Sequence, residues 1–305
     1  MGRRYLFLLV LTAAIWGASY MFIKVAVREI DPVPMMALRL VLAAAVLFPL
    51  IVIQRGGAET VSEIRRGGWG LVLIGLINSA LPFTLIAWGE THVTSSVAAI
   101  ANAPVPIFVA VLAIKLRHSE RVTGLRLVGI VLGFVGVGIL VGLQPEGGWW
   151  AVAGTLAVVG AALCYAFANL YAQGRFASTS PIVVVAGSSL WGALMLAPIA
   201  LFQLPSEMPS AKALACVAML GIVGTAFALI LYYKLLQGYG SSRASLVTYL
   251  IPLFAVIYGV TILDESLHAN AILGLAFILG GVALGSGALR YVRRREPASA
   301  AAPPA

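Results

Sequence analysis

Charged side chains are scarce in this sequence. Only 10% of its 305 residues are Asp, Glu, Lys or Arg, whereas 61% are hydrophobic. A water-soluble domain has about a quarter charged residues, and it could not bury this much apolar surface. The long uncharged runs are apolar around the whole helix rather than along one stripe, which is typical of segments solvated by lipid. We therefore predict an all-α integral membrane protein.

The residues that most catalytic and metal sites require are also few. Cys164 and Cys216 lie inside apolar runs, where we interpret them as packing residues and not as a disulfide or metal ligands. The two aspartates and three histidines lie near the ends of the runs, and no carboxylate pair, Ser-His pair or metal motif is visible. We expect no catalytic residue, no metal and no cofactor. An intramembrane enzyme stays open as an alternative from another class.

The net charge of +9 is spread along the chain rather than gathered in one segment. A nucleic-acid binder gathers its Lys and Arg on one folded face, so no nucleic acid is expected as a partner. Lys and Arg that flank membrane spans are retained on the cytoplasmic side. With the N-terminus inside, 16 of the 20 basic residues fall in cytoplasmic segments. We predict a multi-pass protein of the plasma (inner) membrane with both termini in the cytoplasm.

Breaks rich in charge or turn residues divide the chain into ten apolar spans, each of about the 20 residues needed to cross a bilayer. The spans lie near residues 5–27, 33–54, 69–90, 93–115, 122–143, 149–172, 181–202, 211–236, 242–263 and 268–289. The first is interpreted as a retained helix and not as a signal peptide. The connections are short and leave no room for a nucleotide-hydrolysing domain, so any energy for transport must come from a gradient.

The two halves of the chain share a pattern of residues. Ala13-Ala14-Ile15 matches Ala161-Ala162-Leu163 at a displacement of 148, and Pro104 matches Pro252 at the same displacement. Because each half holds five spans, an odd number, the second half must enter the membrane from the opposite side. We predict two inverted five-helix units, 1–144 and 145–290, and a disordered cytoplasmic tail, 291–305. Inverted repeats are typical of secondary transporters.

This pattern resembles the EamA-type carriers of the drug/metabolite transporter superfamily over nearly the whole chain. The residues that carry the resemblance are Trp16, Gly17, Ser19, Pro104, Glu120 and Gly129 in the first half and Pro252, Glu265, Gly274 and Gly281 in the second. Cys164-Tyr165 departs from the pattern, since it stands where the first half has Trp16-Gly17. The resemblance is specific for the fold and weak for the substrate.

The resemblance implies a central cavity lined by the first, third, fourth, sixth, eighth and ninth spans. Because bacterial members include amino-acid exporters, among them the aromatic amino-acid exporters, it also implies a function. We expect a monomeric secondary transporter that works by alternating access and exports small organic metabolites, chiefly amino acids or related zwitterionic or neutral solutes. A passive channel-like facilitator, an exporter of drugs or other metabolites, and a receptor without flux stay open as alternatives.

Polar and aromatic residues of the implied lining spans are the candidate substrate-binding residues. They are Trp16, Ser19, Tyr20, Asn78, Ser79, Trp88, Ser96, Asn102, Tyr165, Asn169, Tyr232 and Tyr249. An amide without a partner is costly in lipid, so the asparagines should face a cavity or another helix. Hydrogen bonding between helices would explain them equally well.

Arg39 is the deepest cation, and an arginine at a helix centre costs about 2.5 to 3.5 kcal/mol to insert. It could bind a substrate carboxylate, or its long stem could reach the outer interface. Lys24 and Glu90, near the outer ends of their spans, present the same ambiguity. No titratable residue of certain midplane depth indicates proton coupling.

Prolines and glycines suggest where helices bend and where they approach closely. Pro82, Pro104 and Pro252 are candidate hinge or gating positions, with a static kink as the alternative. Small residues spaced four apart, Gly129 with Gly133 and Gly281 with Gly285, let helices approach closely. We favour contact between the fifth and tenth spans over dimerisation.

Overall fold

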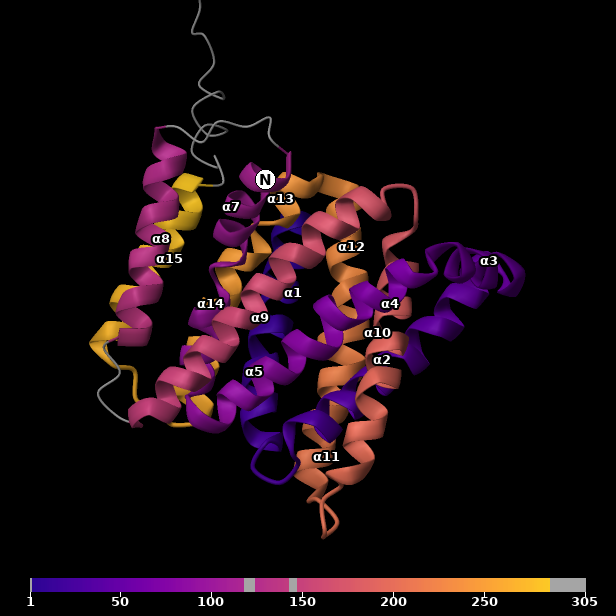
Figure 1. Ribbon diagram of the computed structural model, residues 1–305, viewed down its shortest axis with the longest axis horizontal. Helices are drawn as coiled ribbons and strands as arrows, with labels where there is room; N and C mark the ends of the chain where they lie inside the picture. Colours follow the sequence, from indigo (N-terminus) through magenta and orange to yellow (C-terminus); the bar gives the residue numbers. More distant parts are fainter. Residues whose placement is uncertain (1, 118–123, 143–146, 286–305) are drawn as a thin grey trace, which may run out of the picture.

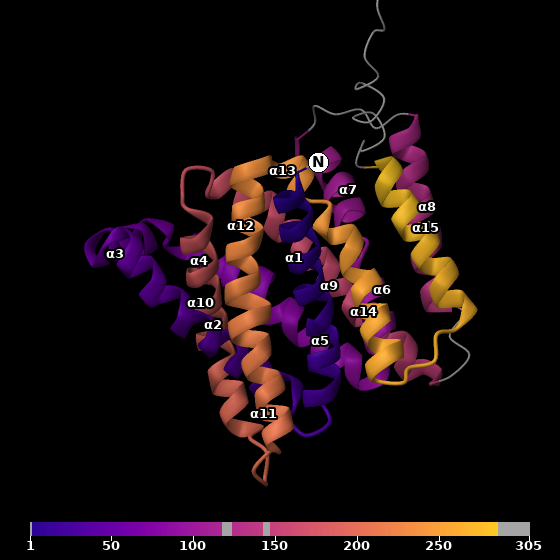
Figure 2. The same cartoon turned by 180° about the vertical axis from the view of Figure 1, so that it is seen from behind.

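The computed structural model describes residues 2–117, 124–142 and 147–285, and in these ranges every regular element is a helix. The helices are α1 (Arg3–Ala26), α2 (Pro32–Arg55), α3 (Gly57–Gly67), α4 (Trp69–Gly75), η1 (Leu76–Ala80), α5 (Leu81–His92), α6 (Ser95–Asn102), α7 (Val105–Arg117), α8 (Leu125–Gly142), α9 (Gly148–Arg175), α10 (Pro181–Phe202), α11 (Ala211–Ala218), η2 (Met219–Phe227), α12 (Ala228–Tyr239), α13 (Ser241–Ala244), α14 (Val247–Ile262) and α15 (Ala269–Gly285). Figures 1 and 2 show them as one bundle of tilted helices, with α3 projecting from one side.

Seven helical segments of the described chain are long and apolar enough to cross a membrane. They are Arg3–Ala26, Pro32–Arg55, Trp69–His92, Ser95–Ala113, Gly148–Arg175, Pro181–Phe202 and Ala211–Tyr239. Three shorter apolar helices, Leu127–Val141, Val247–Ile262 and Ala269–Leu284, fall in the fifth, ninth and tenth expected spans. The all-helical, multi-pass prediction is confirmed.

Local sequence signals explain where the long helices begin and end. Pro32 occupies the first turn of α2, where its missing N–H removes no hydrogen bond. Gly56 ends α2 with φ at 87°, a conformation that a residue with a Cβ rarely adopts. Thr94 and Ser210 cap α6 and α11 by accepting a hydrogen bond from the backbone N–H three residues on. These caps place the turns between the spans.

Two helices contain a π-helical turn at corresponding places. The segment η1 interrupts the third span, and η2 interrupts the eighth. Gly75, beside η1, packs so closely on α10 that a Cβ would lie 2.8 Å from Trp191 Cβ. Gly221 of η2, 146 residues later, packs in the same way on α2, where a Cβ would lie 2.6 Å from Leu42 Cβ. Each π turn therefore lies against the second long helix of the other half.

Glycines bring α8 and α15 into direct backbone contact. A Cβ on Gly281 would lie 2.5 Å from the carbonyl oxygen of Gly129, and a Cβ on Gly136 would lie 2.9 Å from that of Gly274. Figures 1 and 2 show the two helices side by side at one edge of the bundle. The predicted contact between the fifth and tenth spans is confirmed. The two contacts exchange with each other when 145 is added to or subtracted from the residue numbers.

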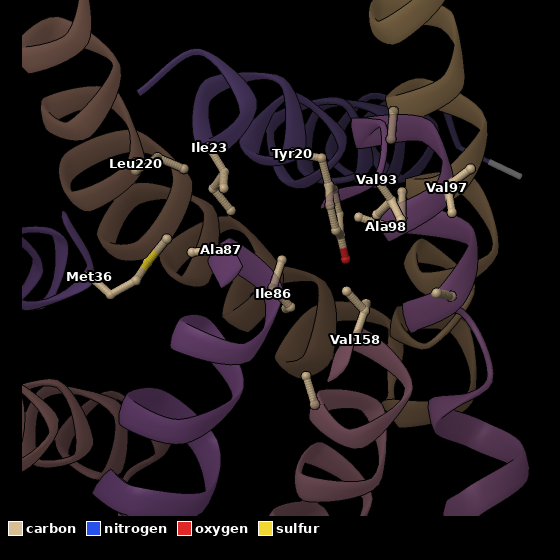
Figure 3. Packing of buried hydrophobic residues seen from close by; sticks show 14 of the residues in the cluster. Tyr20, Ile23, Met36, Ile86, Ala87, Val93, Val97, Ala98, Val158 and Leu220 are labelled. Atoms are coloured by element: carbon tan, nitrogen blue, oxygen red, sulfur yellow. The ribbon is translucent and has the colours of Figure 1, made fainter. Parts of the chain in front are cut away.

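Two buried clusters hold the centre together. The larger lies where α1, α2, α5, α6, α9 and η2 meet, and it is built largely from small residues that let the helices approach closely (Figure 3). The smaller lies at the N-terminal end of α1, where Tyr5, Leu8 and Leu9 pack against Leu235 of α12 and Val247 of α14. The smaller cluster seals one end of the bundle with apolar side chains.

The candidate hinge prolines occupy three different settings. Pro104 lies between α6 and α7, so the fourth span is broken at this residue. Pro82 lies in the first turn of α5, directly after η1. Pro252 is buried inside α14. Pro82 and Pro104 therefore mark real interruptions in helix geometry.

Candidate functional site

Buried and half-buried charged and polar side chains lie between the helices that form the larger cluster. We call the buried polar cluster the set Tyr20, Lys24, Arg39, Glu90, Asn102 and Glu265. The charges of Lys24, Glu265 and Arg39 all act on Glu90, and those of Glu90 and Arg39 act on Tyr20. Since charges interact strongly in a medium of low dielectric constant, the ionisable members of this set influence one another.

Arg39 turns into the protein and does not reach the outer interface. Its residue is 6% exposed, and its Nε donates to Thr225 Oγ1 of η2 at 3.0 Å. The guanidinium carbon lies 3.9 Å from the centroid of the Phe83 ring, within the range of a cation–π contact. In the described part of the chain, no carboxylate lies within salt-bridge distance of Arg39. Arg39 is thus a buried cation without an acidic partner.

The other half of the chain makes the same contact with two serines. Ser79 Oγ donates to Ser188 Oγ at 3.2 Å. Ser79 stands 146 residues before Thr225, and Ser188 stands 149 residues after Arg39. The corresponding helix contact is therefore packed around a small hydroxyl, so a guanidinium is not a general requirement of this contact.

Lys24 is engaged with the end of α5. Its Nζ donates to the backbone carbonyls of Glu90, at 2.6 Å, and Val93, at 2.7 Å. The last carbonyls of a helix have no partners inside the helix and carry partial negative charge. Lys24 therefore caps α5 and ties it to α1.

Glu265 is engaged in the same way with the start of α6. Its carboxylate accepts hydrogen bonds from Ser95 N at 2.7 Å, Ser96 N at 3.0 Å and Ser96 Oγ at 2.7 Å. A carboxylate is stabilising beside the free N–H groups of a helix N-terminus. Gly259 makes room for it, because a Cβ there would collide with Ser96 Oγ and Glu265 Oε2. Glu265 is therefore a structural cap.

Glu90 is the acid of the cluster whose carboxylate makes no hydrogen bond in the described chain. Its residue is 0% exposed, and neither carboxylate oxygen has a hydrogen-bond partner in the described chain. Asn102 is close to the same unit, since its Nδ2 donates to the Tyr20 hydroxyl at 2.9 Å while its Oδ1 has no partner in the described ranges. Figure 3 shows the Tyr20 hydroxyl pointing away from α1, towards Val158 of α9 and Ile86 of α5. Buried acceptors without donors are costly and call for a ligand or water.

The structure brings some expected binding residues to this cluster and leaves others elsewhere. Tyr20, Arg39 and Asn102 belong to it, and Tyr165 lies within the electrostatic reach of Arg39. Ser96 contributes through its bonds to Glu265. Ser79 donates to Ser188, as described above, and so marks the corresponding place in the other half.

The remaining expected residues lie outside the buried polar cluster. Trp16 packs against Tyr232 at a centroid distance of 5.2 Å, and the Ser19 hydroxyl donates to Ile15 O. Tyr249 donates to Val282 O. The other three are Trp88, which lines a hollow of ≈350 Å³ near the start of α2, Asn78, which is half-buried, and Asn169, which is exposed on α9.

Sequence reasoning did not select Lys24, Phe83, Glu90, Thr225 and Glu265 as binding-site residues. The charged three carried a usable signal, because an acid or base within a few residues of an apolar run must either leave the membrane or find partners. Phe83 and Thr225 carried none, since such residues are common in membrane helices. Only the packing of α5 and η2 on α2 identifies them.

Family comparison agrees with the fold. A family model described as the EamA-like transporter family matches residues 3–142 and again residues 152–287. The chain belongs to this family. A solved chain described as "Crystal structure of protein" shares the fold, with a TM-score of 0.65 and 22% identity over 95% of this chain and 98% of that one.

Individual relatives of this family member are distant but cover it almost completely. An uncharacterized transporter of Archaeoglobus fulgidus is 26% identical, over 90% of this chain and 95% of its own length. The uncharacterized inner membrane transporter YedA of Escherichia coli is 25% identical, over 88% and 86%. A probable amino-acid metabolite efflux pump of Salmonella typhimurium is 27% identical, over 92% and 94%. These relatives are thus described as transporters or as an efflux pump.

Proposed function

We propose that this protein is a secondary transporter that exports small organic metabolites, chiefly amino acids, by alternating access. The observation that carries the proposal is the buried guanidinium of Arg39, which has no acidic partner in the described chain and whose counterpart in the other half is the small residue Ser188. A buried cation without an opposite charge lowers the stability of the protein, and such a residue is typically kept because it serves binding. A substrate carboxylate is the partner that would satisfy it.

The architecture proposed for this function is ten membrane helices in two inverted units, 1–144 and 145–290, around a central binding site. Three observations support it: the two consecutive family matches, the π turns at corresponding places, and the glycine contacts that exchange between the halves. Two similar halves can exchange conformations and open one site to either side in turn. Both termini lie in the cytoplasm in this arrangement, as the distribution of Lys and Arg favours.

The substrate class follows from the surroundings of Arg39. Phe83 packs on the Arg39 guanidinium and Tyr165 packs on Phe83, so aromatic surface lies beside this cation, which suits a carboxylate with a moderately apolar body. The amino-acid efflux description of the Salmonella typhimurium relative is consistent with this class. The protein is proposed to act as a monomer in the inner membrane, without a cofactor.

Counterflow in proteoliposomes tests the function directly. Vesicles loaded with unlabelled phenylalanine, leucine, threonine or glutamine are diluted into a trace of the same labelled amino acid. A carrier produces transient, saturable accumulation of label for at least one of them, whereas a passive channel produces equilibration without overshoot. Empty vesicles and vesicles with heat-denatured protein are the controls. Absence of overshoot for the whole panel would contradict amino-acid export.

A further inference from the structure

Four buried or half-buried charged groups lie in the polar cluster, and two of them are already committed to the fold. Lys24 donates its hydrogen bonds to the end of α5, and Glu265 accepts hydrogen bonds from the start of α6. Arg39 and Glu90 are the two that remain. In the described chain they form no salt bridge with each other or with any other residue, although their charges interact.

The remaining pair has a definite chemical complement. One guanidinium calls for an anion, and one carboxylate calls for a cation with N–H donors. Four buried side-chain atoms of this region have no partner in the described chain: both carboxylate oxygens of Glu90, Oδ1 of Asn102 and Oγ of Ser95. The first three can only accept hydrogen bonds, and the hydroxyl of Ser95 can accept as well as donate. A primary ammonium has three N–H donors and one positive charge, which matches three acceptors and one negative charge.

From this complementarity we infer that Glu90, with Asn102, is the subsite for the substrate ammonium, while Arg39 takes the carboxylate of the same molecule. The transported class is then the zwitterionic α-amino acid, and not the corresponding keto acid, hydroxy acid or amine. This inference rests on the proposed function and extends it to a residue outside the expected site. Glu90 is a specificity-determining residue in this arrangement.

Lys24 offers the competing explanation, in which Glu90 only balances a fixed charge in the core. Lys24 is the strongest charged neighbour of Glu90. Its Nζ nevertheless binds main-chain oxygens and leaves both Glu90 oxygens free. A purely structural Glu90 would matter equally for every ligand, whereas an ammonium subsite would matter only for ligands that carry an ammonium group.

Three probes of one shape separate these explanations: phenylalanine, 3-phenylpropanoate, which lacks the ammonium, and phenethylamine, which lacks the carboxylate. Each competes with labelled phenylalanine in counterflow. In the wild type, phenylalanine should compete better than either analogue. In Glu90→Gln, half-inhibition by phenylalanine and by phenethylamine should require about ten- to hundredfold more ligand, because a charge-assisted hydrogen bond is lost. 3-Phenylpropanoate should change by less than about twofold.

Arg39→Gln is the mirror control, and it should weaken phenylalanine and 3-phenylpropanoate while sparing phenethylamine. Glu59→Gln on the exposed face of α3 is the matched control for loss of one acid, and it should change none of the three values. Equal weakening of all three probes in Glu90→Gln, or no change, overturns the ammonium subsite and leaves amino-acid export standing. No counterflow with any amino acid in the wild type overturns both.

Discussion

Arg39 lies at a position where the other half of the chain packs a small polar side chain. Ser188 fills the corresponding place, and both residues bond to a hydroxyl on a π-helical neighbour, Thr225 in one case and Ser79 in the other. A buried charge without an opposite charge lowers stability. A residue that costs stability and is dispensable for packing is typical of a binding site.

This cost predicts opposite effects on stability and transport. Arg39→Gln should leave the melting temperature unchanged or raise it, because a buried charge is removed. The same variant should lower the apparent affinity for a transported amino acid about ten- to hundredfold, because a charge-assisted contact is lost. Thermal unfolding in detergent and counterflow are measured on the same preparation. Ser188→Ala is the control, with transport near that of the wild type. A large loss of stability in Arg39→Gln would argue for a structural role.

The sequence predicted part of this site and could not predict the rest. Tyr20, Arg39 and Asn102 were accessible because their polarity is anomalous deep inside an apolar run. Glu90 and Lys24 lie close to the ends of their runs, where sequence distance cannot distinguish a solvated charge from a buried one. Their burial depends on how the turn between α5 and α6 folds back against α1, which is a tertiary property.

At the scale of elements, the start of α6 and the end of α14 approach each other closely. The Glu265 carboxylate accepts hydrogen bonds from the start of α6, and Gly259 of α14 has no Cβ to obstruct this contact. Gly259→Ala places a methyl group on Ser96 Oγ and Glu265 Oε2. We expect a loss of about 1 to 3 kcal/mol, typical of overpacking, seen as a lower melting temperature in detergent. Gly238→Ala, at a helical position with open space around it, should show no such loss. Equal behaviour of the two variants would contradict the tight approach.

The turn between α1 and α2 is tied to the start of α11 by a pair of hydrogen bonds. Glu29 accepts from Ser210 N at 2.6 Å and from Ser210 Oγ at 2.7 Å, and these bonds lower the pKa of the Glu29 carboxyl. Since the pKa is lower in the folded protein, the tether stabilises at pH above the ordinary glutamate value and is lost as pH falls through the lowered one.

The tether should therefore be visible as a pH-dependent difference between two proteins. Wild type should melt slightly higher than Glu29→Gln at neutral pH, and the difference should shrink as the pH falls below the ordinary glutamate pKa and vanish below the lowered pKa. The substitution Glu207→Gln, at another exposed acid in the same loop region, supplies the control. A difference that persists unchanged in acid would exclude an ionised Glu29 as the cause.

Helix positions followed closely from composition, but helix interruptions did not. Each of the ten expected spans contains an apolar helix. The π turns at η1 and η2 were not expected, because a π turn depends on one extra residue accommodated by packing and leaves no periodic signal. Pro104 did indicate its break, since proline cannot donate the backbone hydrogen bond that would continue the helix.

For the whole molecule, the proposed inverted arrangement predicts which loops face each side of the membrane. In a background with Cys164→Ala and Cys216→Ala, single cysteines are introduced at exposed positions in a loop and at helix starts. Met208→Cys and Gly148→Cys should react with an impermeant maleimide in intact cells, whereas Gly57→Cys and Arg3→Cys should react only after permeabilisation. Labelling of Gly148→Cys and Arg3→Cys from the same side would rule out an odd number of spans between them.

Three positions of the polar cluster differ between the two halves. Tyr20, Lys24 and Arg39 correspond to Ala168, Ala172 and Ser188. In an assembly of two identical polypeptides every ionised group occurs twice, so a guanidinium near the axis would face a second one and repel it. A chain that contains both halves is free of this constraint. It can keep a single guanidinium without a symmetry-related copy, and a small asymmetric molecule with distinct ends can then bind in a single orientation.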